Sequence, residues 1–200
     1  MAIAMEFIRN FLKKWETRQL IGYIPCEKRN YREGPGEGFE PIGQSGVTIA
    51  TGLDLGQQTR GALIRYGITG TLLEKLSPYL EKTRYRAIDA LRERPLAVTD
   101  EECTLIDDLV HADYVKQAQT AFDRMSPFNF TDTPKEVQTA LVSMYYQLGS
   151  RACRHAAWRF LAAGKIGKAA ETLCSDRTRY KARRRDEGKL LKRTGGEQDA

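Results

Sequence analysis

The sequence predicts an α+β fold that is mostly α-helical, with a small N-terminal β-sheet lobe and a helical C-terminal lobe. Apolar residues recur at spacings of three and four in the first 16 residues and again from Gln57 onward, which is typical of amphipathic helices. Between Ile21 and Gly56 the chain is rich in glycine, proline and β-branched residues, which favours short strands and long turns. Its 200 residues suffice for one domain, or for two lobes that share a core.

We therefore expect a single domain over residues 1–200. Residues 1–95 form the small lobe with the N-terminal helix and sheet, and residues 96–200 form the helical lobe. The segment Pro95–Val98 is the expected boundary. A cleft between two lobes is a common place for a substrate site.

Local signals place the individual elements. The first helix has Ala4, Phe7, Ile8, Phe11 and Trp15 on one side. Residues 31–44, with four glycines and two prolines, predict a flexible loop. Thr99–Glu102 is a capping-box pattern that opens a helix through about Met125, and Thr133 with Pro134 opens another that ends at Gly149. Further helices are expected over residues 151–163, 166–174 and 179–192.

Positive charge is concentrated near the C-terminus. The net charge is +6, and Arg177–Arg193 holds nine basic and two acidic residues, a local balance of +7 that leaves the rest of the chain at −1. Such a segment binds nucleic acid, lipid headgroups or an anionic wall polymer, or it is simply a solvated helix face. Tyr180 is the only aromatic residue of this segment and no nucleic-acid-binding motif is visible, so we expect no nucleic-acid partner. The non-enzymatic alternative is a basic protein that binds nucleic acid or the cell wall.

Composition excludes several other classes. No stretch approaches the roughly 18 apolar residues of a membrane span, and the N-terminus lacks the apolar run of a secretory signal. The four cysteines show no CxxC pair and no metal-ligand spacing, and the chain has only two histidines. We therefore expect reduced thiols, no metal, no cofactor and no integral membrane segment.

The stretch Ser45–Gly56 is the first candidate for chemistry. Thr48 and Asp54 are six residues apart, which in a continuous strand places both on one face, although Gly52 indicates a bend between them. A hydroxyl and a carboxylate that converge can hold and deprotonate water. The alternative is a tight turn in which Asp54 caps a helix that starts near Gln57.

Glu16 is the second candidate, because it follows the apolar Trp15 at the end of the first helix. Contact with an aromatic surface removes hydration from a carboxyl group and favours its protonated form, as a general acid requires. A nearby arginine would favour the ionised form. The alternative is a surface glutamate at a helix end.

Two segments resemble the pesticin-type branch of the phage lysozymes. In that group a helix ends in a catalytic glutamate, a Gly-Tyr-x-Pro segment follows, and then a Ser-Gly-Val-Thr-Ile-Gly-x-Gly-x-Asp-Leu-Gly motif. Trp15–Pro25 and Ser45–Gln57 are similar to these. Val137–Gly149 resembles the buried helix that ends in Gln-(Leu/Met)-Gly, and Arg183–Lys189 resembles the Arg-rich C-terminal helix. The resemblance implies a lysozyme-like two-lobe fold.

By position, the resemblance implies that Glu16 is the general acid and that Thr48 and Asp54 position water. Ala50 and Thr17 depart from the family, which usually has glycine at both positions. Residues 26–44 are an enlarged insertion that contains further glutamates, Glu27, Glu33, Glu37 and Glu40. Glu27 is the second choice for the acid because it also follows an apolar stretch, whereas Glu33 and Glu37 lie among glycines.

The implied enzyme is a lysozyme (N-acetylmuramidase), a glycoside hydrolase that cleaves the β-1,4 bond between N-acetylmuramic acid and N-acetylglucosamine in peptidoglycan. Water held by Asp54 and Thr48 implies inversion, direct attack by Asp54 implies retention, and a lytic transglycosylase is a further alternative. One of Arg183, Arg184 or Arg185 is expected to reach the cleft and brace Glu16. We expect a monomeric, bacteriolytic phage endolysin that is made in the host cytoplasm without a signal peptide. A holin would release it to the periplasm of a Gram-negative host. The alternative is a bacterial toxin with an immunity protein.

Overall fold

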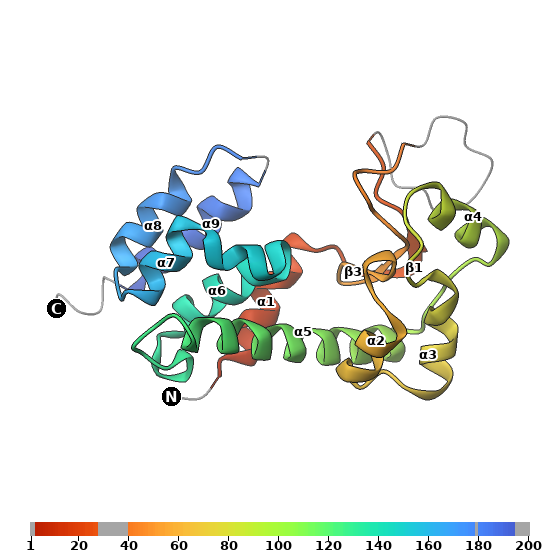
Figure 1. Cartoon of the computed structure of the whole chain (residues 1–200), viewed down its shortest axis with the longest axis horizontal. Helices are drawn as coiled ribbons and strands as arrows, with labels where there is room; N and C mark the ends of the chain where they lie inside the picture. The colour runs from red at the N-terminus through yellow and green to blue at the C-terminus, as the bar shows by residue number, and fades with distance from the viewer. Residues whose placement is uncertain (1–2, 28–39, 179, 195–200) are drawn as a thin grey trace. The chain divides into compact units, whose positions relative to one another are not determined.

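The computed structural model describes residues 3–27, 40–178 and 180–194. The chain forms two compact units (Figure 1). One comprises Glu16–His111, and the other comprises Met1–Trp15 together with Ala112–Ala200. Helices dominate and one small antiparallel sheet is present, which confirms the predicted α+β class.

The sheet belongs to the unit Glu16–His111. Its strands β1 (Gln19–Tyr23), β2 (Thr48–Ala50) and β3 (Leu53–Asp54) lie in the order β1-β2-β3, and both pairings are antiparallel. The buried side chains of Val47, Ile49 and Leu55 anchor the sheet in the core of this unit. The other elements are η1 (Leu55–Gln57), α2 (Arg60–Tyr66), α3 (Gly70–Leu76), η2 (Ser77–Tyr79), α4 (Tyr85–Glu93) and the first half of α5 (Asp100–Asp123).

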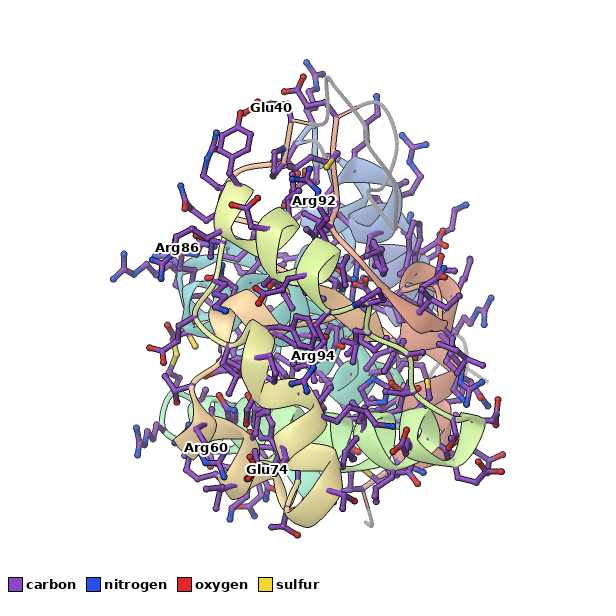
Figure 2. The ribbon with its side chains drawn as sticks, turned by 90° about the vertical axis from the view of Figure 1, so that its right-hand side faces the viewer. Glu40, Arg60, Glu74, Arg86, Arg92 and Arg94 are labelled. Carbon is purple, nitrogen blue, oxygen red and sulfur yellow. The ribbon has the colours of Figure 1, made fainter. Side chains whose placement is uncertain are left out.

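Helices α2 and α3 are joined on their surface by an ion pair between Arg60 and Glu74 (Figure 2). Arg60 also donates to Ser77 Oγ at 2.7 Å. Both charged side chains are exposed, so the pair adds little to the stability of the unit and mainly orients the two short helices.

The expected lobe boundary at Pro95–Val98 is wrong. The Gly22 amide donates to the Leu96 carbonyl at 2.8 Å, the Val98 amide donates to the Leu20 carbonyl at 2.9 Å, and Ile21 bridges to Ala97. Backbone hydrogen bonds of this kind fix the segment to β1, inside the same unit. The division between the units falls instead within α5, after His111.

The N-terminal helix, which the sequence placed in the small lobe, belongs to the helical unit. Ile8 and Leu12 of α1 (Met5–Trp15) are fully buried in the same core as α6 (Lys135–Leu148), and the two helices pack together (Figure 1). The Ala4 amide also donates to Gln138 Oε1 at 3.0 Å. The apolar face of α1 was correctly predicted, but only tertiary packing decides which partner it covers.

Helix α6 is the centre of the helical unit, because every residue from Val137 to Tyr145 is buried. A helix that is buried on all sides needs neighbours all round. These are drawn from α1 and from the C-terminal elements η4 (Gly149–Arg154), α7 (Ala156–Ala162), α8 (Ile166–Cys174) and α9 (Lys181–Lys192), with η3 (Phe130–Asp132) before α6.

The helix ends test the predicted capping signals. The capping box is confirmed: the Thr99 amide donates to Glu102 Oε2 at 2.9 Å, and the Glu102 amide donates to Thr99 Oγ1 at 3.1 Å. Thr133 as a helix cap is wrong, because its hydroxyl donates to the Phe130 carbonyl at 2.7 Å and α6 begins at Lys135. The Thr133 hydroxyl therefore forms its hydrogen bond with the preceding η3 turn and not, as the sequence predicted, with the helix.

Two further findings concern membrane and metal chemistry. Within the described residues, no helix combines the length and the apolar character needed to cross a membrane. Over the same part of the chain, His, Cys, Asp and Glu side chains form no group of three that could hold a metal ion. The four cysteines are free thiols.

Candidate active site

Thr48 and Asp54 lie on one face of a β-hairpin. They are direct cross-strand partners in the β2–β3 pair, and cross-strand partners project to the same side of a sheet. The sequence predicted a shared face from the even spacing along one strand. The shared face is confirmed, but its cause is that the chain reverses between Ala50 and Gly52, both of which have positive φ (53° and 85°).

The carboxylate of Asp54 is held by backbone amides. Its Oδ1 accepts from Gly56 at 2.9 Å and from Gly46 at 3.1 Å, and its Oδ2 accepts from Gly46 at 3.3 Å. Asp54 therefore caps the short η1 turn, whereas the turn alternative expected it to cap a helix that starts near Gln57; the next helix, α2, begins at Arg60 and is capped by Thr59. Burial raises the pKa of Asp54, and the amides of Gly46, Gly56 and Gln57 partly oppose this rise. A higher proton affinity makes this carboxylate a stronger base.

Thr48 lies beside the same backbone segment. Its side chain is buried, and Oγ1 donates to the Gly46 carbonyl at a long 3.4 Å. Asp54 contacts the amide of Gly46 and Thr48 contacts its carbonyl, so Gly46 sets the spacing between the two functional groups. A Cβ at Gly46 would lie 2.7 Å from Asp54 Oδ1, which explains why glycine is needed at this position.

Glu16 lies against the turn of the same hairpin. A Cβ at Gly52 would lie only 3.0 Å from Glu16 Oε2, and Gly52 also has a φ of 85°. Glycine at position 52 therefore satisfies the backbone and leaves room for the carboxylate. The structure thus brings the half-buried Glu16 to the hairpin that carries Thr48 and Asp54.

Two polar contacts that the sequence did not predict fasten this arrangement to α5. Arg18, two residues after Glu16, donates to Asp100 Oδ1 at 2.6 Å and to Thr104 Oγ1 at 3.1 Å. Thr51, in the hairpin turn, donates from its amide to Asp107 Oδ1 at 2.9 Å and from its hydroxyl to Asp107 Oδ2 at 2.6 Å.

Both contacts lie on one face of the first two turns of α5, because positions 100, 104 and 107 follow helical spacing. The same stretch of helix thus holds the segment after Glu16 and the turn that Glu16 touches. Asp107 is buried, and a buried carboxylate with both oxygens bonded is a firm anchor. In the sequence, Asp107 is one of two adjacent acidic residues, Asp107 and Asp108, that lie between the apolar positions 106 and 109.

Loosening the Thr51 anchor is expected to slow the reaction without abolishing it. Thr51→Val leaves a buried Asp107 oxygen without its hydroxyl partner, at a cost of about 1–3 kcal/mol in stability. Displacement of the turn by about 1 Å lowers kcat on the order of 100-fold with little change in KM. Purified variants assayed on peptidoglycan at a temperature where all remain folded provide the measurement.

Thr51→Ser keeps the hydroxyl and is expected to restore most of kcat. Thr69→Val is the matched control, since Thr69 is exposed in the same unit and its side chain makes no cap hydrogen bond. Equal kcat in Thr51→Val and Thr69→Val would show that the turn needs no anchor.

The other glutamates of the insertion differ in their surroundings, which bears on whether they could be the general acid. Glu27 is exposed, and its amide donates to the Glu40 carbonyl at 3.0 Å. The carboxylate of Glu40 (Figure 2) accepts from the Tyr85 hydroxyl at 2.5 Å and pairs with Arg84 at 2.7 Å, and these contacts lower its pKa. The remaining candidates, Glu33 and Glu37, lie outside the described residues. Glu40 is thus committed to a surface cluster, and Glu27 remains the alternative acid.

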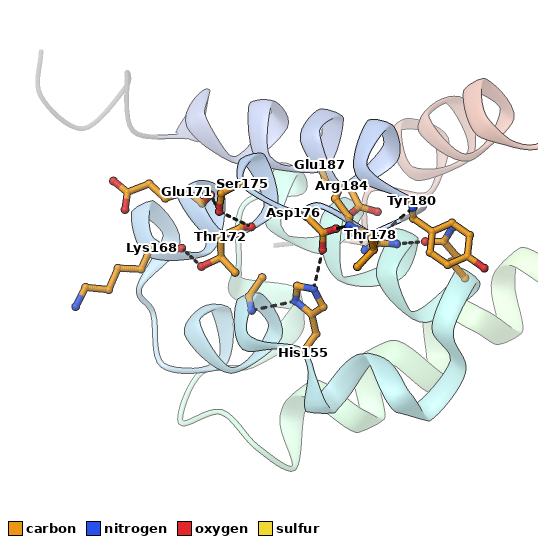
Figure 3. A network of polar contacts seen from close by, with 12 residues as sticks. His155, Lys168, Glu171, Thr172, Ser175, Asp176, Thr178, Tyr180, Arg184 and Glu187 are labelled. Carbon is orange, nitrogen blue, oxygen red and sulfur yellow. Dashed lines mark hydrogen bonds and ion pairs between the residues drawn. The ribbon is translucent and has the colours of Figure 1, made fainter.

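The arginines of α9 form a buried cluster within their own unit. Arg183 and Arg184 are both almost fully buried, and Arg184 Nη1 lies 2.6 Å from Glu187 Oε2 (Figure 3). Ser143 of α6 donates to Glu187 Oε1 at 2.5 Å and accepts from Arg183 Nε at 3.0 Å. The predicted bracing of Glu16 by one of these arginines, or by the exposed Arg185, stays a prediction, because Glu16 belongs to the other unit.

Comparison with known proteins gives two findings. The family model described as "Pesticin: Bacterial toxin homologue of phage lysozyme, C-term" matches residues 7–164, a range that includes Glu16, Thr48 and Asp54. The crystal structure of a mutant of P22 lysozyme is similar over 96% of this chain and 98% of that chain, with a TM-score of 0.53 and 18% sequence identity. No curated protein matches the chain.

At 18% identity, the likeness to the P22 enzyme shows the fold alone, and that fold confirms the predicted lysozyme-like α+β architecture. The family model is stronger evidence of membership, because it spans well over half of the chain and includes both sequence motifs, Trp15–Pro25 and Ser45–Gln57. The chain therefore belongs to the pesticin family of phage-lysozyme homologues.

Proposed function

We propose that the protein is a lysozyme that hydrolyses the β-1,4 bond between N-acetylmuramic acid and N-acetylglucosamine in peptidoglycan. Family and fold support a muramidase-type peptidoglycan hydrolase. The observation that carries the proposal is the contact of the Glu16 carboxylate with the turn of the hairpin on which Thr48 and Asp54 face the same side. Glycoside hydrolysis needs two such groups flanking the scissile bond.

In this mechanism Glu16 protonates the leaving oxygen while Asp54, assisted by Thr48, holds and deprotonates water on the opposite face of the sugar. A water molecule held by Asp54 and Thr48 would attack the anomeric carbon from the face opposite the leaving oxygen, which inverts the configuration of that carbon. We therefore propose inversion. The long bond to Oδ2 leaves that oxygen as the acceptor for the water proton.

The proposed biological role is that of an endolysin that reaches the Gram-negative wall after holin-dependent release. The description of the family as homologues of phage lysozyme in bacterial toxins favours a second role, a toxin domain that requires an immunity protein. Both roles use the same bond cleavage, so the chemical test applies to either.

Mass spectrometry of muropeptides from digested peptidoglycan tests the chemistry. We expect products with a reducing N-acetylmuramic acid end, and, in ¹⁸O-labelled water, one heavy oxygen at that end. Anhydro ends would identify a transglycosylase, and free peptides without glycan cleavage would exclude a glycosidase. Proton NMR of the first products, read before mutarotation, assigns the anomer and decides between inversion and retention.

A further inference from the structure

A groove between α1 and α9 lies apart from the residues assigned to the chemistry. Its volume is about 530 Å³, and it lies wholly within the helical unit. This volume falls within the about 300–1,000 Å³ range of small-ligand sites. The proposed mechanism gives this groove no role.

The floor of the groove is apolar. Phe7 and Phe11 are one turn apart on α1 and both are partly exposed, while Leu190 contributes from α9. The ammonium group of Lys135 lies 5.2 Å from the centre of the Phe7 ring, so a cation also borders this floor.

The rim of the groove carries an excess of positive charge. Lys14 and Asp186 form an ion pair with each other, which neutralises one end. Lys189 of α9 and Arg193, the residue directly after that helix, are exposed and have no carboxylate partner in the part of the chain that the structure describes. Lys135 lies 4.0 Å from the carboxylate of Glu136 and adds no unpaired charge, so Lys189 and Arg193 are the cations that make the rim suited to an anion.

We propose that this groove binds the stem peptide of peptidoglycan, a short chain with more carboxylates than amines and with small apolar side chains. The lining from Phe7 to Lys14 spans seven helical steps, about 10 Å, which matches about three extended residues. Methyl groups would contact the two phenyl rings while carboxylates reach Lys189 and Arg193. A concave site of this length cannot be filled by a flat membrane surface.

The inference rests on the proposed function, because it takes the peptide from the same polymer whose glycan is cleaved. It adds a second point of attachment that depends on the peptide and not on the sugar. Lys14, at one end of the groove, precedes Glu16 by two residues in the chain.

Isothermal titration of the full chain with a soluble stem tetrapeptide tests the site directly. We expect saturable binding that weakens with salt and that falls roughly tenfold in the charge-reversed double variant Lys189→Glu/Arg193→Glu, since each exposed pair contributes modestly. The matched control, Lys168→Glu/Lys192→Glu, makes the same change of net charge at exposed lysines of the same unit outside this groove. It is expected to bind like wild type.

Hydrolysis of two substrates gives the second readout. The Lys189→Glu/Arg193→Glu variant is expected to show a raised KM on intact peptidoglycan and an unchanged rate on glycan strands stripped of peptide. Absence of peptide binding by wild type, equal losses in the two double variants, or binding of phosphatidylglycerol vesicles in place of the peptide would each overturn the inference. Peptide binding without glycan cleavage would overturn the proposed function and leave the groove assignment standing.

Discussion

Glu16→Gln is expected to lower the rate of peptidoglycan hydrolysis by a factor of about 10²–10⁴, because an amide cannot supply the proton that a general acid gives to the leaving oxygen. The amide has nearly the shape of the carboxyl group, so its contact with the Gly52 turn is retained. The expected change is therefore in kcat, with the unfolding temperature close to that of wild type. Release of soluble muropeptides, quantified by chromatography, provides the measurement.

The matched control is Glu27→Gln, which makes the same chemical change at an exposed glutamate of the same unit. It is expected to retain wild-type activity. If Glu27→Gln loses activity and Glu16→Gln keeps it, the acid is Glu27 and the contact between Glu16 and the hairpin is structural.

The second large effect concerns stability and lies in the helical unit. Burial raises the pKa of Glu187 to about 7, against the lowering influence of Arg184, of the Ser143 hydroxyl and of Arg183. A carboxyl group whose pKa is higher in the folded than in the unfolded chain binds more protons when folded between about pH 4.5 and 7. Its contribution is fully present below pH 4.5 and is lost as the pH rises to about 7, a decrease of about 3 kcal/mol.

Glu187→Gln removes this proton linkage and keeps an acceptor for Ser143. We expect the free energy of unfolding of wild type to fall relative to that of the variant between pH 4.5 and 7, measured by urea denaturation at fixed ionic strength. The difference isolates Glu187 from the other titratable and charged groups around it, which are Arg183, Arg184, Asp176, Tyr180 and His155. If the free energy of unfolding of wild type instead rises relative to that of Glu187→Gln between pH 4.5 and 7, the two guanidinium groups lower the pKa of Glu187 by more than burial raises it.

Local sequence signals predicted where helices begin and end better than they predicted which helices pack together. The capping box at Thr99 depends only on residues three apart in the chain, and it formed as expected. The hydroxyl of Thr133 could accept from a helix amide as a cap or donate to a nearby carbonyl, and in the structure it donates to the carbonyl of Phe130. The packing of α1 on α6 joins residues more than 100 positions apart, and no local pattern encodes that choice.

The candidate site shows the same limit. The spacing of Thr48 and Asp54 is visible in the sequence, and so is the position of Glu16 at a helix end. The anchor between Thr51 and Asp107 joins residues 56 positions apart, and either side chain alone looks like an ordinary polar residue. In the sequence, Glu187 and its two arginine partners are part of a basic run that fits an anion-binding surface or a solvated helix face, and charge counts carry no information about their burial.

The sharing of one core by α1 and α6 also constrains how the chain matures. A ribosome that adds about ten residues per second produces the partners of Ile8 and Leu12 on the order of ten seconds after these two residues. During that interval the amphipathic leading segment has no native surface to cover, whereas residues 16–111 are already available to fold among themselves. Early chaperone capture of the nascent chain should therefore centre on α1 within this region, and moving α1 to follow α9 by circular permutation should shorten that exposure.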